Sequence, residues 1–168
     1  MKKDERAQIE KNKKKLSIKS MYFNRYLLVR YVSALFFFTN VYWLTSLLMS
    51  DSPLFFIPLL LIIAVLCSVV EQVKILSHHT NQATYTKYSF STLFIANVLL
   101  MIMTCFSSSF TQLYPFLVNQ TSSQILVLGV LGIGVVLSGF ILYRLYLIRH
   151  DEDKHYSRIK KYEEVIHS

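Results

Sequence analysis

Cysteine, proline and glycine are scarce in this chain of 168 residues, which contains two, three and four of them. So few cysteines exclude a disulfide-stabilised scaffold, and so few glycines exclude a collagen-like repeat. Apolar residues are abundant: they make up 53% of the chain, and aromatic residues alone make up 14%. This abundance excludes an intrinsically disordered protein, which lacks the apolar surface needed to fold.

Charged residues are absent from four long apolar stretches. A helix that crosses a membrane needs about 20 mostly apolar residues, whereas spanning β-strands need about 10 residues of alternating polarity, a pattern that these stretches lack. The sequence therefore predicts an all-α, polytopic integral membrane protein: a four-transmembrane-helix bundle with cytoplasmic N- and C-terminal helical extensions. The predicted transmembrane domain is 31–143, with spans at about 31–49, 53–70, 88–106 and 125–143.

Lysine and arginine are distributed unevenly between the two sides of this predicted bundle. Residues 1–30 hold ten of the 18 basic side chains, the loop between the second and third spans holds two, and residues 144–168 hold six. The other two loops hold none, and basic loops stay on the cytoplasmic side of a membrane. We therefore expect a multi-pass protein of a cell inner (plasma) membrane, of bacterial type, with both termini in the cytoplasm.

Only three residues, 50–52, separate the first two spans, which predicts a tight antiparallel helix pair. Asp51 or Ser52 is expected to cap the second helix. Pro53 suits the first turn of that helix, where its missing N–H would have no helical partner.

The N-terminal segment, 1–30, is rich in lysine. We expect it to contact anionic lipids of the inner leaflet, which attract each basic side chain by about 1 kcal/mol. Docking to an acidic protein partner is the alternative, and no nucleic acid is expected because no nucleic-acid-binding module accompanies the charge. The lysines assigned to these contacts are Lys11, Lys13, Lys14, Lys15 and Lys19.

The C-terminal tail, 144–168, is predicted to be a cytoplasmic helix. Four of its apolar and aromatic residues recur at helical spacing, which indicates an amphipathic helix. A lone helix of this length is marginal in water, so we expect it to pack on the N-terminal segment, the membrane surface or another protein. The four residues are Tyr156, Ile159, Tyr162 and Ile166.

The loop between the third and fourth spans, 107–124, carries no charge and contains the run Leu113-Tyr114-Pro115-Phe116. Aromatic side chains favour the headgroup level of a membrane, so this loop is interpreted as an interfacial anchor. A lid or a docking surface is the functional alternative.

No Asp, Glu, Lys, Arg or His occurs within the four predicted spans. Ion-coupled transporters and proton relays usually keep an ionisable side chain there, and no phosphate-binding loop, HExxH motif or nucleophile elbow occurs in the chain. The histidines do not have the spacing of a known metal site. We therefore expect no enzymatic activity, no cofactor and no metal site. The five histidines are His78, His79, His150, His155 and His167.

Glu71 is the acidic residue closest to a span, at the inner boundary of the second one. It lies within plausible reach of Arg30 or Arg144 at the same boundary. We therefore predict a structural ion pair among these three residues, in preference to a coupling site.

Asn40 and Asn97 are each the tenth residue of their predicted span, and both spans run in the same direction. The two amides should therefore lie near one depth, around the bilayer centre. A bare amide in hydrocarbon costs several kcal/mol, so we predict that they bond directly or through a shared water or hydroxyl. A substrate-contacting polar site is the alternative. The other candidate partners are Thr39, Ser68 and Ser138.

All four glycines lie in the fourth span, and small residues let helices approach closely in lipid. At 100° per residue Gly129, Gly132 and Gly139 share one face, whereas Gly134 and Ser138 share the opposite face. We hypothesise that one face packs within the bundle and the other meets a partner helix or a second copy. On this view, Gly134→Leu disrupts association and leaves the monomer folded.

The two cysteines, Cys67 and Cys105, lie in different spans. Their predicted depths differ too much for the roughly 7 Å between Cα atoms that a disulfide allows. We interpret both as packing residues.

These features favour a non-enzymatic membrane accessory or scaffold protein that acts through helix–helix contacts with a membrane partner. One alternative is a small transporter, or a transporter subunit, for an uncharged or lipid-like substrate. Another is a bacteriocin-immunity-type membrane protein. The expected partners are membrane lipids and another membrane protein or a second copy of the chain.

Overall fold

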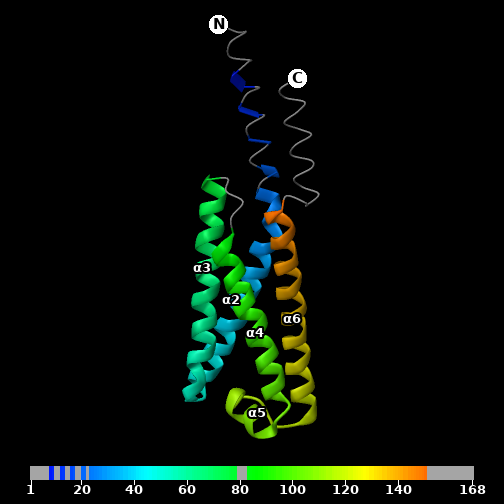
Figure 1. Cartoon of the computed structure of the whole chain (residues 1–168). Coiled ribbons are helices and arrows are strands. Elements are labelled where there is room, and N and C mark those ends of the chain that lie inside the picture. The colour runs from blue at the N-terminus through cyan, green and yellow to red at the C-terminus, as the bar shows by residue number, and fades with distance from the viewer. Residues whose placement is uncertain are drawn as a thin grey trace.

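The computed structural model describes residues 23–78 and 83–150, together with the pairs 8–9, 12–13, 16–17 and 20–21. Within these ranges all regular structure is helical (Figure 1). The elements are α2 (Leu27–Met49), η1 (Pro53–Phe55), α3 (Phe56–His78), α4 (Thr84–Thr104), α5 (Ser107–Leu113) and α6 (Thr121–Arg149). The predicted C-terminal helix, with Tyr156, Ile159, Tyr162 and Ile166, lies outside the described residues.

Four helices are long and apolar enough to cross a membrane, as the sequence predicts. They extend beyond the predicted spans, because α4 begins at Thr84 and α6 continues to Arg149. The uncharged stretch marks only the section that suits hydrocarbon, whereas backbone hydrogen bonding continues through serine, threonine, tyrosine and arginine until the chain is capped. The four candidate spans are Leu27–Met49, Pro53–Ile75, Thr84–Thr104 and Thr121–Arg149.

The helices run up and down between two ends of the bundle (Figure 1). We call one the Arg25 end, where α2 and α4 begin and α6 finishes, and the other the α5 end. Helix α4 packs between α3 and α6, while α2 packs along α3 and touches α6 much less. Helix α2 starts beside α6 at the Arg25 end and crosses over, so that it lies beside α3 at the α5 end (Figure 1).

The turn between α2 and η1 is as tight as predicted. The backbone N–H of Ser52 donates to the Leu47 carbonyl over 3.1 Å, and Asp51 takes a left-handed backbone conformation with φ of 49°. The Ser52 hydroxyl accepts a hydrogen bond from the Leu54 N–H over 3.4 Å. Ser52 is therefore the cap, and Pro53 follows it as the first helical residue.

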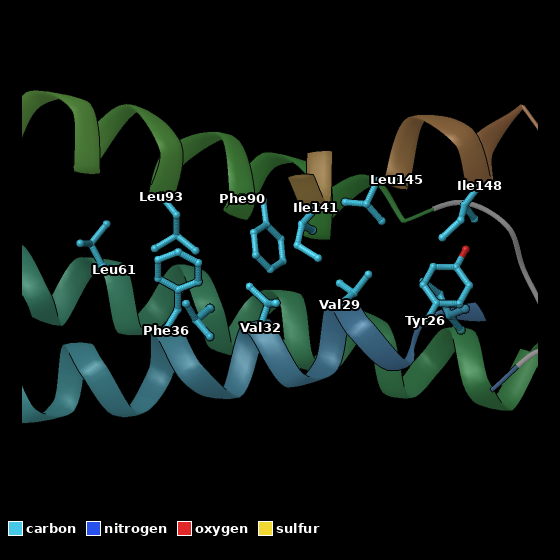
Figure 2. Packing of buried hydrophobic residues seen from close by; sticks show 12 residues of the cluster. Tyr26, Val29, Val32, Phe36, Leu61, Phe90, Leu93, Ile141, Leu145 and Ile148 are labelled. Carbon is cyan, nitrogen blue, oxygen red and sulfur yellow. The ribbon is translucent and has the colours of Figure 1, made fainter. Parts of the chain in front are cut away.

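The core consists of two clusters. The larger one fills the Arg25 half of the bundle, where Phe36 of α2 meets Phe90 of α4 edge to face, with ring centroids 6.2 Å apart. Figure 2 shows Val29, Val32 and Phe36 pointing across at the side chains of α4 and α6. The smaller cluster lies at the α5 end. It consists of Leu100, Phe110, Leu113, Tyr114, Val127 and Leu131.

Helix α5 and the residue after it close the α5 end of the bundle. Phe110, Leu113 and Tyr114 are buried there, while Phe116 and Val118 are exposed. The buried part of this loop is thus a plug, which corrects its interpretation as an anchor: its aromatic residues fill the gap between helix ends. Only the exposed part keeps the geometry that an anchor requires.

Candidate functional site

A cavity of about 390 Å³ lies between α2, α4 and α6. Asn40 and Asn97 line it near the middle of their helices, and Phe116 and Leu117 line it at the α5 end. Most of the remaining wall is aliphatic or aromatic and comes from α2 and α6. We refer to it as the α2–α6 cavity.

The cavity exists because α2 diverges from α6. At the Arg25 end the two helices are joined, where the Arg25 Nη2 donates to the Ile148 carbonyl over 3.0 Å and both side chains are buried. At the α5 end, the Trp43 Nε1 donates to the Leu113 carbonyl over 3.2 Å. The Trp43 ring also stacks on Tyr114, with centroids 5.7 Å apart. Contacts between distant segments therefore hold the start of α2 against the end of α6, and close the cavity at the α5 end.

Asn40 and Asn97 are both more than nine-tenths buried, at 6% and 8% exposure. Each side-chain nitrogen donates to a carbonyl of its own helix: Asn40 Nδ2 to Phe36 over 2.8 Å, and Asn97 Nδ2 to Leu93 over 2.7 Å. Among the hydrogen bonds of the described residues, none joins the two amides and none ends on either amide oxygen. A bridge between them through a water or hydroxyl stays a prediction.

The three other candidate partners for these amides are engaged elsewhere. Thr39 Oγ1 donates to the Leu35 carbonyl and Ser138 Oγ to the Gly134 carbonyl, each within its own helix. Ser68 Oγ accepts from Gln72 Nε2 over 2.9 Å. None of these hydroxyl groups donates to the amide oxygen of Asn40 or Asn97.

The two small-residue faces of α6 have different surroundings. A Cβ added at Gly134 would lie 2.7 Å from Asn97 Oδ1, and both Gly134 and Ser138 are buried. Gly139 has only Phe94 nearby, at 3.6 Å. The expectation that Gly134→Leu leaves the monomer folded is therefore wrong, because this residue packs against α4 inside the bundle.

Gly129 and Gly132 have no atom within 4 Å of an added Cβ. Their backbone is consequently accessible from outside the bundle, on the side of α6 opposite Gly134. We call this surface the open glycine face. It is the small-residue face of α6 that a neighbouring helix could approach closely.

Glu71 caps a helix, and among the described residues it forms no ion pair with Arg30 or Arg144. Its carboxylate oxygens accept from the backbone N–H groups of Tyr85 and Thr86 over 3.0 and 2.6 Å. Arg30 instead donates to the Gln72 carbonyl over 3.4 Å and lies 4.3 Å from the Phe23 ring centroid. The predicted ion pair of Arg30, Glu71 and Arg144 is wrong, because the return of the chain into α4 offers the carboxylate two backbone donors that have no helical partner.

A buried polar layer that sequence reasoning missed lies at the Arg25 end. Gln72 Nε2 of α3 donates to Ser33 Oγ of α2 over 3.0 Å as well as to Ser68. On the other side of α3, Ser89 Oγ of α4 donates to the Ala64 carbonyl over 2.6 Å. The sequence contained a signal for this layer, since Gln72 is the second residue after the second apolar stretch and the serines interrupt apolar runs.

The remaining candidate residues form no site within the described ranges. Of the five lysines, Lys13 is exposed, and Lys11, Lys14, Lys15 and Lys19 lie outside those ranges. No group of three or more metal-ligating side chains occurs among the residues described. Cys67 on α3 and Cys105 directly after α4 are free and exposed, so their interpretation as packing residues is wrong.

Comparison of the chain with protein-family models, with curated proteins and with solved structures finds no match. The function is consequently inferred from three features of the structure itself: the α2–α6 cavity, the open glycine face and the polar layer around Gln72. Of these, the first two are accessible to another molecule.

Proposed function

We propose that this chain is a non-enzymatic accessory or scaffold protein that lies in a membrane and contacts a partner through α6. Large apolar side chains cover the outside of the bundle, including Phe38 and Val136, which are about 70% exposed (68% and 71%). Such continuous apolar surface is unfavourable in water and favourable in hydrocarbon. The membrane that fits best is a bacterial inner membrane, with the Arg25 end in the cytoplasm.

The single observation that supports a partner is the open glycine face. An accessible glycine backbone lets a second helix approach closely, which increases van der Waals contact in lipid. The partner is then another membrane protein or a second copy of this chain.

Purification in a mild detergent, followed by light scattering and identification of co-purifying proteins, tests this function. Gly132→Ile should remove association, because its side chain occupies the space that the neighbouring helix needs. Val70→Ile is the matched control, since Val70 is exposed on α3, away from the open glycine face. Equal association in the wild type and in both variants would contradict the proposal.

Orientation is tested separately with single cysteines in a background that lacks Cys67 and Cys105. Cysteines at Ser20 and His78 should react only with reagents that reach the cytoplasm. A cysteine at Ser122 should react in intact cells with a reagent that does not cross membranes. Labelling of position 20 in intact cells would reverse the assignment.

Transport of an uncharged or lipid-like substrate is the second candidate. The α2–α6 cavity favours it, because a transport protein needs a site that a substrate can occupy. Flux of a substrate through vesicles that contain only this protein would place this candidate first.

A further inference from the structure

We propose that the α2–α6 cavity is a binding site for an uncharged amphiphile dissolved in the membrane. The ligand would have an apolar body and a hydrogen-bond donor, such as a hydroxyl or an amide N–H, at its buried end. Such a ligand requires the membrane location proposed above, but it does not require the partner at the open glycine face.

The two asparagines indicate that the ligand carries a hydrogen-bond donor at its buried end. Each amide uses one N–H to bond its own helix, and the oxygens of Asn40 and Asn97 accept no hydrogen bond from the described residues. An acceptor in an apolar cavity gains most from a ligand that brings a donor, because an unmade bond there costs about 1–3 kcal/mol. A hydroxyl or amide N–H supplies that donor.

The composition of the cavity wall indicates that the ligand carries no charge. No Asp, Glu, Lys, Arg or His is among the residues that line the cavity. A charged head would therefore lose its hydration without gaining an opposite charge, which is strongly unfavourable. An uncharged molecule avoids this cost.

The size of the cavity fits a small molecule. Its volume of about 390 Å³ lies within the range of small-molecule sites. Its α6 wall extends from Leu126 to Leu137, which spans about 16 Å of helix axis.

The route into the cavity is lateral. Leu35 of α2 and Val130 and Ile133 of α6 line the cavity and are also at least half exposed on the outside of the bundle. The α5 end is closed by the contact between Trp43 and Leu113. A ligand therefore enters between α2 and α6, from the hydrocarbon in which an amphiphile is already dissolved.

Trp43 provides a direct readout, because it is the single tryptophan of the chain and lines the cavity. The purified full chain in detergent micelles is titrated with 11-bromoundecanol, whose bromine quenches tryptophan fluorescence on contact. We expect saturable quenching that unbrominated undecanol reverses by competition. Bromododecane, which lacks the hydroxyl, should bind more weakly.

Variants distinguish binding in the cavity from general partitioning of the bromoalcohol into the micelle. Asn40→Leu and Asn97→Leu should each weaken binding of the alcohol by about 2- to 10-fold, the loss of one hydrogen bond, and leave the affinity for the bromoalkane unchanged. Val130→Phe should block saturable quenching by filling the mouth of the cavity. Val136→Phe, on the outward side of α6, is the matched control and should bind as the wild type does.

Quenching that does not saturate, or that is equal in Val130→Phe and Val136→Phe, would overturn the site. So would failure of unbrominated undecanol to compete in the wild type, a measurement that needs no variant to fold. If a helix of a second copy filled the cavity, Val130→Phe would lower the molar mass measured by light scattering and the wild type would not be quenched. The variant Gly132→Ile tests the scaffold function separately. It should lose association, and its quenching by the bromoalcohol should equal that of the wild type.

Discussion

The carboxylate of Glu71, in the last part of α3, accepts hydrogen bonds from the backbone N–H groups at the start of α4, including that of Thr86 at 2.6 Å. This single side chain joins two consecutive helices across the loop between them. A carboxylate in this place satisfies backbone donors that no helical carbonyl can reach, and its charge is favourable beside the positive end of the helix dipole.

Removal of this cap should destabilise the pairing of α3 with α4. Glu71→Ala is expected to cost about 0.5–2 kcal/mol, the usual effect of losing a cap, and Glu71→Gln should cost less because an acceptor oxygen remains. The change is measured as the free energy of unfolding in mixed micelles. Lys74→Ala, an exposed residue one turn along α3, is the control and should have no comparable effect. Equal stability of Glu71→Ala and the wild type would contradict the capping role.

Methyl groups added to α6 should have opposite outcomes on its two faces. Gly134→Ala places a Cβ against Asn97 Oδ1 and should cost about 1–3 kcal/mol, as overpacking does. Gly132→Ala meets open space and should be neutral or slightly stabilising in the monomer. Thermal unfolding of both variants checks this, and the cost of Gly134→Ala should shrink in an Asn97→Ala background. The same cost in both backgrounds would mean that the contact with Asn97 is not its cause.

The interhelical bond from Gln72 to Ser33 should be detectable as a coupling energy. Hydrogen bonds between helices in a membrane average about 0.6 kcal/mol, with a maximum of about 1.7 kcal/mol. A double-mutant cycle of Gln72→Leu and Ser33→Ala should therefore give a coupling in this range. Ser46→Ala, whose hydroxyl donates only to its own helix, replaces Ser33→Ala in the control cycle and should give none.

Tyr114 should titrate later than an ordinary tyrosine. Burial raises the pKa of Tyr114 to about 12, and a hydrogen bond with the Thr104 side chain offsets part of this effect. Because the folded state then favours the neutral phenol, its contribution to stability is complete below about pH 10 and is lost as the pH rises towards 12. Absorbance at 295 nm should show a late step that Tyr114→Phe removes and that Tyr85→Phe keeps. Stability should also fall less in Tyr114→Phe than in the wild type over this pH range.

Hydropathy alone was sufficient to place the four long helices, because a run of about 20 uncharged apolar residues permits few alternatives. It could not place their ends: α4 begins at Thr84 since helical bonding does not stop where polarity begins. Helical periodicity likewise separated Gly134 from Gly132 by face. It could not say which face points inward, because that depends on which neighbour packs there.

The cavity and the Glu71 cap could not be predicted for a related reason. The cavity depends on the angle at which α2 crosses from α6 to α3, and nothing in the residues of α2 taken alone specifies that angle. The assignment of Glu71 to an arginine considered only charges, although backbone donors at a helix start compete for the same carboxylate. The cavity and the Glu71 cap both depend on how neighbouring helices are placed relative to each other, and not on the individual helices.

The hydrogen bond between Arg25 and Ile148 connects residues 123 positions apart, so it sets an order of assembly. During synthesis, α3 can pack on α2 and α4 on α3 as soon as each is made, since each contacts the helix that precedes it. Helix α6 is the last of the described helices to be made, and its final turn carries the carbonyl that receives Arg25. Until then the side of α2 that lines the cavity has no opposite wall. The cavity thus forms only once α6 has been made, and a nascent chain that stops short of Ile148 would lack the bond that joins the start of α2 to the end of α6.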